Sequence, residues 1–181
     1  MLLYTIQPVE LYEKLLTEKT LVNTGEFFDN FTRDTFVRSY DWMVRQMDFR
    51  GLVKPVKEAK YPFWAWYKYS AEKAKPDLRH AAHAPRGTKC VCLELVLPDN
   101  SILMSNFDLW HFVLNNRPIL PDENWEQLCN EFDSLPPDKQ EMVKQKSWEN
   151  IFSDFDDSPI QATFWNLELQ TVRDVRFFTA R

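Results

Sequence analysis

Polar and aromatic side chains alternate along three stretches of the chain that have the composition of β-strands. Side chains two apart on a strand share a face, so each stretch presents hydrogen-bonding groups or indoles together. The residues are Thr5 and Gln7 near the start, Trp64 and Trp66 in the middle, and Gln161, Thr163 and Trp165 near the end. If these faces converge, they form a pocket with flat π surfaces and neutral donors and acceptors, which suits a planar heteroaromatic ring such as a nucleobase or nicotinamide. The alternative is that the tryptophans fill the core, and the sequence alone favours this alternative.

Charge is distributed unevenly beside these stretches. Residues 68–89 carry six Lys or Arg against two acidic residues, whereas residues 121–157 carry eleven Asp or Glu against three Lys. The basic loop 68–89 either holds phosphates next to the pocket or is only a solvated surface, and the sequence leaves both open. The net charge of −5 argues against a generally basic nucleic-acid binder.

Several classes of protein are excluded by composition. Three glycines are too few for a phosphate-binding or dinucleotide-binding glycine motif. Two Asp/His or His/His pairs, Asp108 with His111 and His80 with His83, have the spacing of metal ligands but lack a third ligand, so we predict no metal. No signal peptide and no apolar run long enough for a membrane is visible, so we expect a soluble, cytoplasmic protein.

The candidate residues must be positioned by an α+β domain. The expected strands cover residues 2–6, 63–67, 90–97, 102–104, 160–169 and 175–180, and the expected helices cover 9–16, 34–50, 106–115, 124–132, 137–146 and 148–152. This order predicts one domain over residues 1–181, with a mixed sheet of about six short strands, flanking helices and a helical acidic insert at about 118–157. Tyr40 falls on the apolar stripe of the helix 34–50 and is expected in the core.

Six groups of residues together resemble an uncharacterised bacterial family, a domain of unknown function, over nearly the whole chain. They are Tyr4-Thr5-Ile6-Gln7, Tyr40-Asp41-Trp42-Met43, Phe63-Trp64-Ala65-Trp66-Tyr67, Ser105-Asn106-Phe107-Asp108-Leu109-Trp110-His111, Leu114-Asn115-Asn116 and Gln161-Ala162-Thr163-Phe164-Trp165.

More distantly, the chain is similar to the ADP-ribosyltransferase-like fold. There a first strand carries a His or Arg, where this chain has Thr5 and Gln7, and an aromatic strand lies near nicotinamide, which Trp64-Ala65-Trp66-Tyr67 resembles. A late strand then carries the catalytic Glu, where this chain has Gln161, followed by a turn at residues 171–174 and a last strand. Gln161 can hydrogen-bond a ribose hydroxyl but brings no negative charge to an oxocarbenium-like transition state.

The resemblance implies NAD as the ligand and a macromolecule as the acceptor of ADP-ribose. Gln161 would take the catalytic position and hold the ribose. The remaining cofactor contacts would be Thr5, Gln7, Trp64, Trp66, Tyr67, Thr163 and Trp165 around the nicotinamide, and Arg79 or Arg86 on the phosphates.

Three hypotheses about function follow. The first is an ADP-ribosyltransferase-like, NAD-binding domain that transfers ADP-ribose, and whether it is an active enzyme stays open because the usual Glu is missing. The second is a non-catalytic module that binds protein or nucleic acid through the basic loop. The third is a partner-regulated component of a toxin or phage-defence system, with the acidic segment as the protein contact. The sequence alone does not identify the substrate, the modified target or the oligomeric state.

Overall fold

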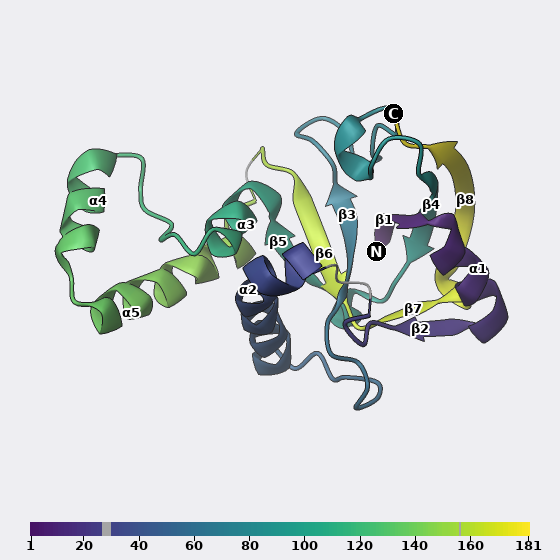
Figure 1. Ribbon diagram of the computed structural model, residues 1–181, viewed down its shortest axis with the longest axis horizontal. Helices are drawn as coiled ribbons and strands as arrows, with labels where there is room; N and C mark the ends of the chain where they lie inside the picture. The colour runs from purple at the N-terminus through teal and green to yellow at the C-terminus, as the bar shows by residue number, and fades with distance from the viewer. Residues whose placement is uncertain (27–29, 156) are drawn as a thin grey trace.

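The structure, a computed structural model, describes residues 1–26, 30–155 and 157–181, and for residues 30–33 it describes the backbone only. Its centre is a sheet of six strands in the order β5-β6-β3-β1-β4-β8, with a two-stranded ribbon, β2-β7, beside it (Figure 1). The strands are β1 (Leu2–Pro8), β2 (Thr20–Val22), β3 (Phe63–Lys68), β4 (Lys89–Val96), β5 (Leu103–Asn106), β6 (Ile160–Phe164), β7 (Asn166–Glu168) and β8 (Val172–Thr179).

All strand pairs in the described part of the chain are antiparallel. The α+β class is therefore confirmed, and the expected mixed sheet is wrong. A parallel neighbour requires a crossover connection, usually a helix, that carries the chain back over the sheet. Here the first helix leads into β2, which pairs with β7 outside the main sheet, and β3 then returns antiparallel to β1.

Helices cover both faces of the sheet. They are α1 (Val9–Glu18), α2 (Asn30–Phe49), α3 (Phe107–Leu114), α4 (Trp125–Ser134) and α5 (Pro137–Trp148), with four short 3-10 turns of which Ala81–His83 (η1) and Glu149–Phe152 (η3) matter below. Neighbouring residues of β3 belong to different cores: Ala65 packs with α1 and the ribbon, whereas Trp64 packs with α2 and α3. The alternation of side chains along the strand thus separates two hydrophobic layers.

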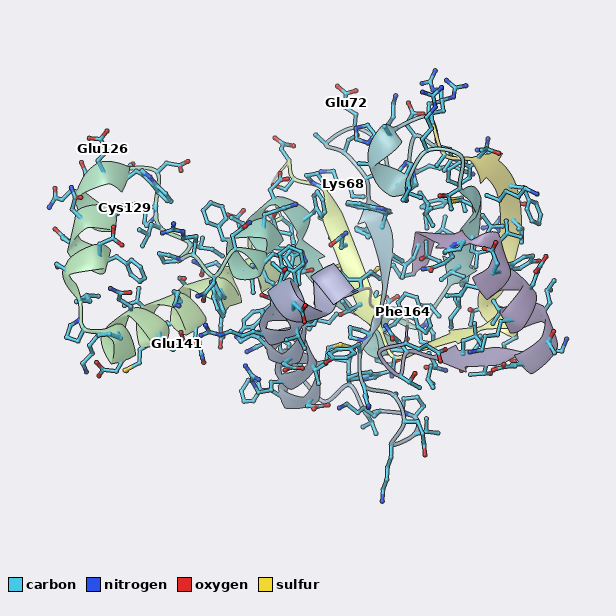
Figure 2. All side chains as sticks on the ribbon, in the orientation of Figure 1. Lys68, Glu72, Glu126, Cys129, Glu141 and Phe164 are labelled. Atoms are coloured by element: carbon cyan, nitrogen blue, oxygen red, sulfur yellow. The ribbon has the colours of Figure 1, made fainter. Side chains whose placement is uncertain are left out.

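The acidic segment projects from the rest of the molecule. Helices α4 and α5 form an arm to one side of the sheet, carrying Glu126, Cys129 and Glu141 far from Phe164 (Figures 1 and 2). The arm is attached through Trp148, which is buried in the core and whose Nε1 donates to the Arg117 carbonyl oxygen at 2.7 Å. The chemistry of the sheet is therefore spatially separate from this arm.

The last long strand is interrupted at Trp165, so the expected single strand over residues 160–169 is wrong. β6 pairs with β3 as far as Phe164 opposite Phe63, which is the first residue of β3. With no further partner there, the chain leaves the main sheet and pairs with β2 instead. The Trp165 side chain lies in the second core, which is the one that contains residues of α2 and α3. There its Nε1 donates to the Leu52 carbonyl oxygen at 2.8 Å.

The segment after β7 also differs from the expectation. Instead of a turn at residues 171–174, a 3-10 turn covers Leu169–Thr171, and β8 begins at Val172. β8 is paired along its length with β4, which places the final strand at one edge of the sheet.

Candidate functional site

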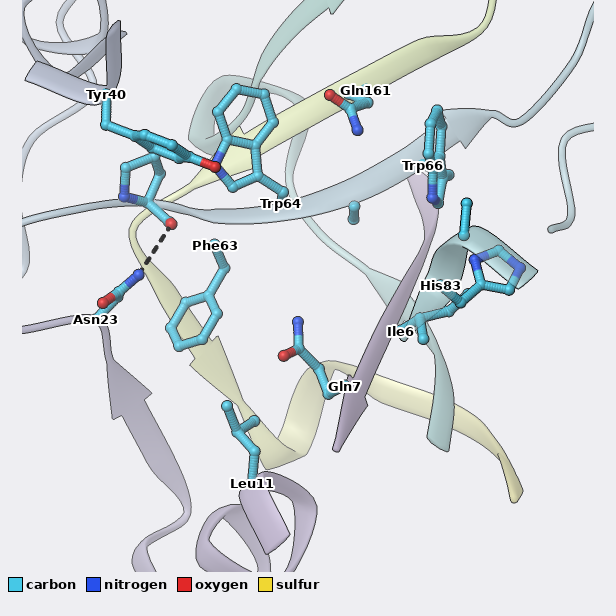
Figure 3. Close-up of a pocket in the computed structure, with 13 residues that line it drawn as sticks. Ile6, Gln7, Leu11, Asn23, Tyr40, Phe63, Trp64, Trp66, His83 and Gln161 are labelled. Atoms are coloured by element: carbon cyan, nitrogen blue, oxygen red, sulfur yellow. Dashed lines mark hydrogen bonds between the residues drawn. The ribbon is translucent and has the colours of Figure 1, made fainter. Parts of the chain in front are cut away.

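A cavity of about 530 Å³ opens where β1 and β3 separate (Figure 3). The two strands are paired only at Tyr4 and Trp66. Beyond this pair, side chains replace the strand ladder: the Thr5 hydroxyl donates to the Trp64 carbonyl oxygen at 2.8 Å, and Gln7 Nε2 donates to the Thr5 hydroxyl at 2.8 Å. The volume is within the range of roughly 300–1,000 Å³ that small-molecule pockets occupy.

Two indoles form the aromatic wall of this pocket. Trp64 and Trp66 project from the same face of β3, and both are partly buried. Trp64 packs against Trp110 at 5.0 Å between ring centroids, and Trp66 packs against Phe107 at 4.8 Å. Residues of α3 therefore pack against both indole rings, and this packing restricts how the two rings can move beside the cavity.

Carboxamide side chains enter the pocket from two different strands. Gln7 comes from β1 and Gln161 from β6, where Gln161 lies in register with Trp66 on one side and Ser105 on the other. In Figure 3 Gln161 is seen between Trp64 and Trp66, with Gln7 facing it from the other side of the opening.

Three buried polar atoms here have no hydrogen-bond partner among the described residues. They are Trp64 Nε1, Ser105 Oγ and Gln161 Oε1. An unsatisfied buried donor or acceptor costs roughly 1–3 kcal/mol, and such atoms are rare in folded proteins. All three residues lie on the same face of the neighbouring strands β3, β6 and β5, so these unpaired polar atoms are concentrated at one place in the fold.

The pocket carries no full charge on the residues described as lining it. Its titratable groups are Tyr40, whose phenol has a pKa raised by burial, and His83 of η1. His83 Nε2 lies 2.8 Å from the Asp77 carbonyl oxygen, which can only accept, so Nε2 carries a proton. The site can therefore bind by stacking and neutral hydrogen bonds, and it contains no carboxylate for acid–base work.

Four of the residues predicted from the sequence line this one cavity: Gln7, Trp64, Trp66 and Gln161. Thr5 lies directly behind them, where it links Gln7 to the Trp64 carbonyl group. Trp64, Trp66 and Gln161 share one face of the sheet, whereas Gln7 belongs to the other face by its register and reaches the cavity where β1 separates from β3.

The other predicted residues lie outside the cavity lining. Thr163 is fully buried and donates to the Leu103 carbonyl oxygen at 3.3 Å, Trp165 is in the second core, and Tyr67 is partly exposed next to Trp66. Arg79 is paired with Asp77 at 2.7 Å, and Arg86 is exposed in the same loop.

Among the lining residues that sequence reasoning missed, three carry polar groups: Tyr40, Asn23 and His83. Tyr40 was expected in the core because it lies on the apolar stripe of its helix, and its ring does pack edge-on against Trp64 at 5.9 Å. Asn23 donates to the Pro62 carbonyl oxygen at 3.5 Å at the mouth of the pocket (Figure 3). His83 had a visible signal, the spacing from His80, but that spacing indicated a metal pair. Within the described part of the chain no three His, Cys, Asp or Glu lie close enough together to hold a metal ion.

Comparisons with known proteins identify a family without assigning an activity. Curated proteins and solved structures gave no match. None of the helices in residues 1–26, 30–155 and 157–181 has the length and apolar character that a membrane span requires. The model of a family described as a domain of unknown function, DUF3841, matches residues 2–173. Because this match covers nearly the whole chain, the protein belongs to the DUF3841 family.

Proposed function

We propose that this chain binds a nucleotide, with NAD as the candidate ligand, and that the pocket between β1 and β3 takes the planar ring. The observation that carries the proposal is that Gln7, Trp64, Trp66 and Gln161, from three strands, line one uncharged cavity. Fixed aromatic faces with a few convergent amides suit a flat, polar, uncharged ring.

The phosphates of such a ligand would lie toward the basic loop 68–89. Residues of η1 in this loop line the pocket, so the loop forms part of its rim. Of its six cations, Lys75 is 3.8 Å from Glu94 and Arg79 is paired with Asp77, whereas Lys68, Lys73, Arg86 and Lys89 form no ion pair with a described residue. Cations without an ion pair in a loop that forms part of the rim favour an anionic group outside the cavity and a neutral ring inside it.

Titration with NAD by isothermal calorimetry and thermal shift tests the binding. A ligand that binds the folded state alone raises the melting temperature as its concentration rises. Trp66→Ala removes one stacking face, worth roughly 1–3 kcal/mol per base, so NAD affinity should fall by about 5-fold to 150-fold. Trp125→Ala is the matched control, because Trp125 lies on α4 in the projecting arm. Equal NAD affinity of Trp66→Ala and wild type, or no nucleotide binding at all, refutes the proposal.

The reaction that we propose for bound NAD is transfer of its ADP-ribose group to a macromolecule. The bond from ribose C1′ to the nicotinamide nitrogen breaks, nicotinamide leaves with the electron pair, and a nucleophile on the target bonds C1′ and loses its proton. Gln161 can hydrogen-bond the ribose but cannot neutralise the positive charge that develops on it. If labelled NAD gives any transfer, Gln161→Glu should increase the rate, and a Gln161→Glu protein that binds NAD but is slower contradicts this role.

A second candidate is suggested by the same unpaired cations: binding of single-stranded nucleic acid by the basic loop. Affinity for a labelled oligonucleotide should then fall steeply as salt rises, because counterions are released on binding. Charge reversal at Lys73 and Arg86 should reduce the slope of log affinity against log salt. A slope that stays unchanged in this double variant rules out the loop as the contact.

A further inference from the structure

We infer that the pocket selects an uncharged ring edge that carries both a hydrogen-bond acceptor and a hydrogen-bond donor, as a carboxamide or a lactam does. The two protein groups are the Trp64 indole N–H, which donates, and the Gln161 carbonyl oxygen, which accepts. This inference rests on the proposed function, since it names the chemical class of the ring that the pocket takes.

The unsatisfied atoms are the starting point. Trp64 Nε1 and Gln161 Oε1 are each buried and each without a hydrogen-bond partner among the described residues, although both residues line the cavity. Two other buried indoles are satisfied within the protein: Trp148 donates to the Arg117 carbonyl group and Trp165 to that of Leu52. In the described part of the chain, the buried side-chain atoms without a partner are those of Trp64, Gln161 and the neighbouring Ser105.

Packing keeps these groups from finding partners inside the protein. The Trp64 ring lies between Trp110 at 5.0 Å and Tyr40 at 5.9 Å, so it has no room to swing toward a backbone carbonyl group. Gln161 Oε1 needs a donor, and neither Trp66 nor Ser105, its neighbours in register, donates to it. Both atoms are shielded from solvent in the free protein, so a ligand that pairs with them displaces the side chains that cover them.

The Ser105 hydroxyl adds to the same polar row. It is fully buried, its Oγ has no partner in the described part of the chain, and it lies across the strands from Gln161. A hydroxyl can both donate and accept. The face of β5, β6 and β3 thus offers a donor, an acceptor and one adaptable group over a short distance.

Complementarity decides which ring edges fit. An N–H needs an acceptor opposite it and a carbonyl oxygen needs a donor, so the ligand must present both. A carboxylate presents acceptors alone and a full negative charge, and the described lining offers no cation to compensate for its lost hydration. A site built to pair with a polar group discriminates strongly against an analogue that leaves its own groups unpaired.

The test compares NAD with nicotinic acid adenine dinucleotide, in which a carboxylate replaces the carboxamide. Calorimetry should show the carboxamide form binding at least about fivefold more tightly, because one mispaired buried group corresponds to roughly 1–3 kcal/mol. Trp64→Phe keeps an aromatic ring but removes the N–H together with the five-membered ring that carries it, so it should weaken NAD binding and reduce the ratio of the two affinities. Trp66→Phe is the matched control, since Trp66 Nε1 is not among the unpaired atoms, and it should keep the ratio.

A lactam base presents the same pattern of donor and acceptor, so a second pair of ligands identifies the source. Uridine monophosphate is compared with its N3-methyl derivative, whose donor is blocked. A preference for the unmethylated form with no such preference in the dinucleotide pair assigns the pocket to a lactam base, and the reverse assigns it to a carboxamide.

Failure of the inference and failure of the proposed function give different results. Equal affinity for both members of each pair, or a preference for the carboxylate or the methylated base, overturns the inference while nucleotide binding stands. Absence of binding by all four ligands overturns the proposed function as well. Thermal melting of each variant confirms that it is folded, and Gln161→Met, which removes the acceptor at similar length, is the second variant should Trp64→Phe not fold.

Discussion

Replacing Gln161 by Met should stabilise the free protein although it removes a group that we assign to the ligand. The two side chains are similar in length, but Met has no polar oxygen to bury. Gln161 Oε1 is buried without a partner among the described residues. Removing such an orphaned acceptor recovers a penalty of roughly 1–3 kcal/mol. Binding sites store unfavourable features of this kind because the ligand relieves them.

The expected gain is smaller than the full penalty. Gln161 is only partly buried, so Met loses the hydration of the exposed part of the amide group. We expect a net increase of about 1 kcal/mol in the free energy of unfolding, using the lower end of the penalty. For a chain of this size this corresponds to a rise of about 2–4 °C in melting temperature.

Urea denaturation followed by tryptophan fluorescence measures the effect, with calorimetry as a second probe of two-state behaviour. Gln7→Met is the matched control, because Gln7 Nε2 donates to the Thr5 hydroxyl at 2.8 Å and the same substitution there should lower stability by roughly 0.5–1.5 kcal/mol. A decrease of 1 kcal/mol or more in the free energy of unfolding of Gln161→Met would show that Gln161 Oε1 is hydrogen-bonded in the free protein. The reasoning that Trp64 Nε1 and Gln161 Oε1 are both without partners would then fail.

Three further predictions follow from other contacts. Ser105→Ala should raise the free energy of unfolding by up to about 1 kcal/mol in urea titrations, because it removes a buried hydroxyl without a partner among the described residues and leaves only a small cavity. Trp165→Phe should lower it by roughly 1–3 kcal/mol, because the Leu52 carbonyl group loses its 2.8 Å donor, and an unchanged midpoint would contradict that view. The hydrogen bond from Arg38 lowers the pKa of Glu141 to about 2 from 4.5, so this pair stabilises the fold above pH 4.5 and its contribution is lost as the pH falls toward 2. Arg38→Gln should make the free energy of unfolding less dependent on pH in that interval. The effect should be small because the Glu141 side chain is about one-third exposed. Identical curves of unfolding free energy against pH for the variant and the wild type would argue against the pairing.

Local patterns in the sequence were sufficient for most of the elements. The strands beginning at Leu2, Phe63 and Lys89 and the helix α3 lie within a few residues of their predicted positions. These segments have strong periodicity or β-branched and aromatic composition, and both properties act over a few residues. The helices of the acidic arm were predicted for the same reason.

Pairing between distant segments was beyond such patterns. The direction of neighbouring strands and the interruption at Trp165 depend on where β3 begins, because β6 has no partner beyond Phe63. The residues on either side of Trp165 carry no local signal that the pairing with β3 ends there, so the sequence predicted one uninterrupted strand.

The candidate site shows the same division. Residue types on the strand faces were enough to single out Gln7, Trp64, Trp66 and Gln161, since alternation alone places hydrogen-bonding groups and indoles on common faces. Their meeting in one cavity, and the inclusion of Tyr40, required the tertiary structure, because it depends on β1 separating from β3 after a single paired position. The sequence by itself determined which groups were available. Only the packing of α3 against Trp64 and Trp66 and the gap beside β1 decided which of these groups remained unpaired, because hydrogen-bond satisfaction depends on distances between segments that are remote along the chain.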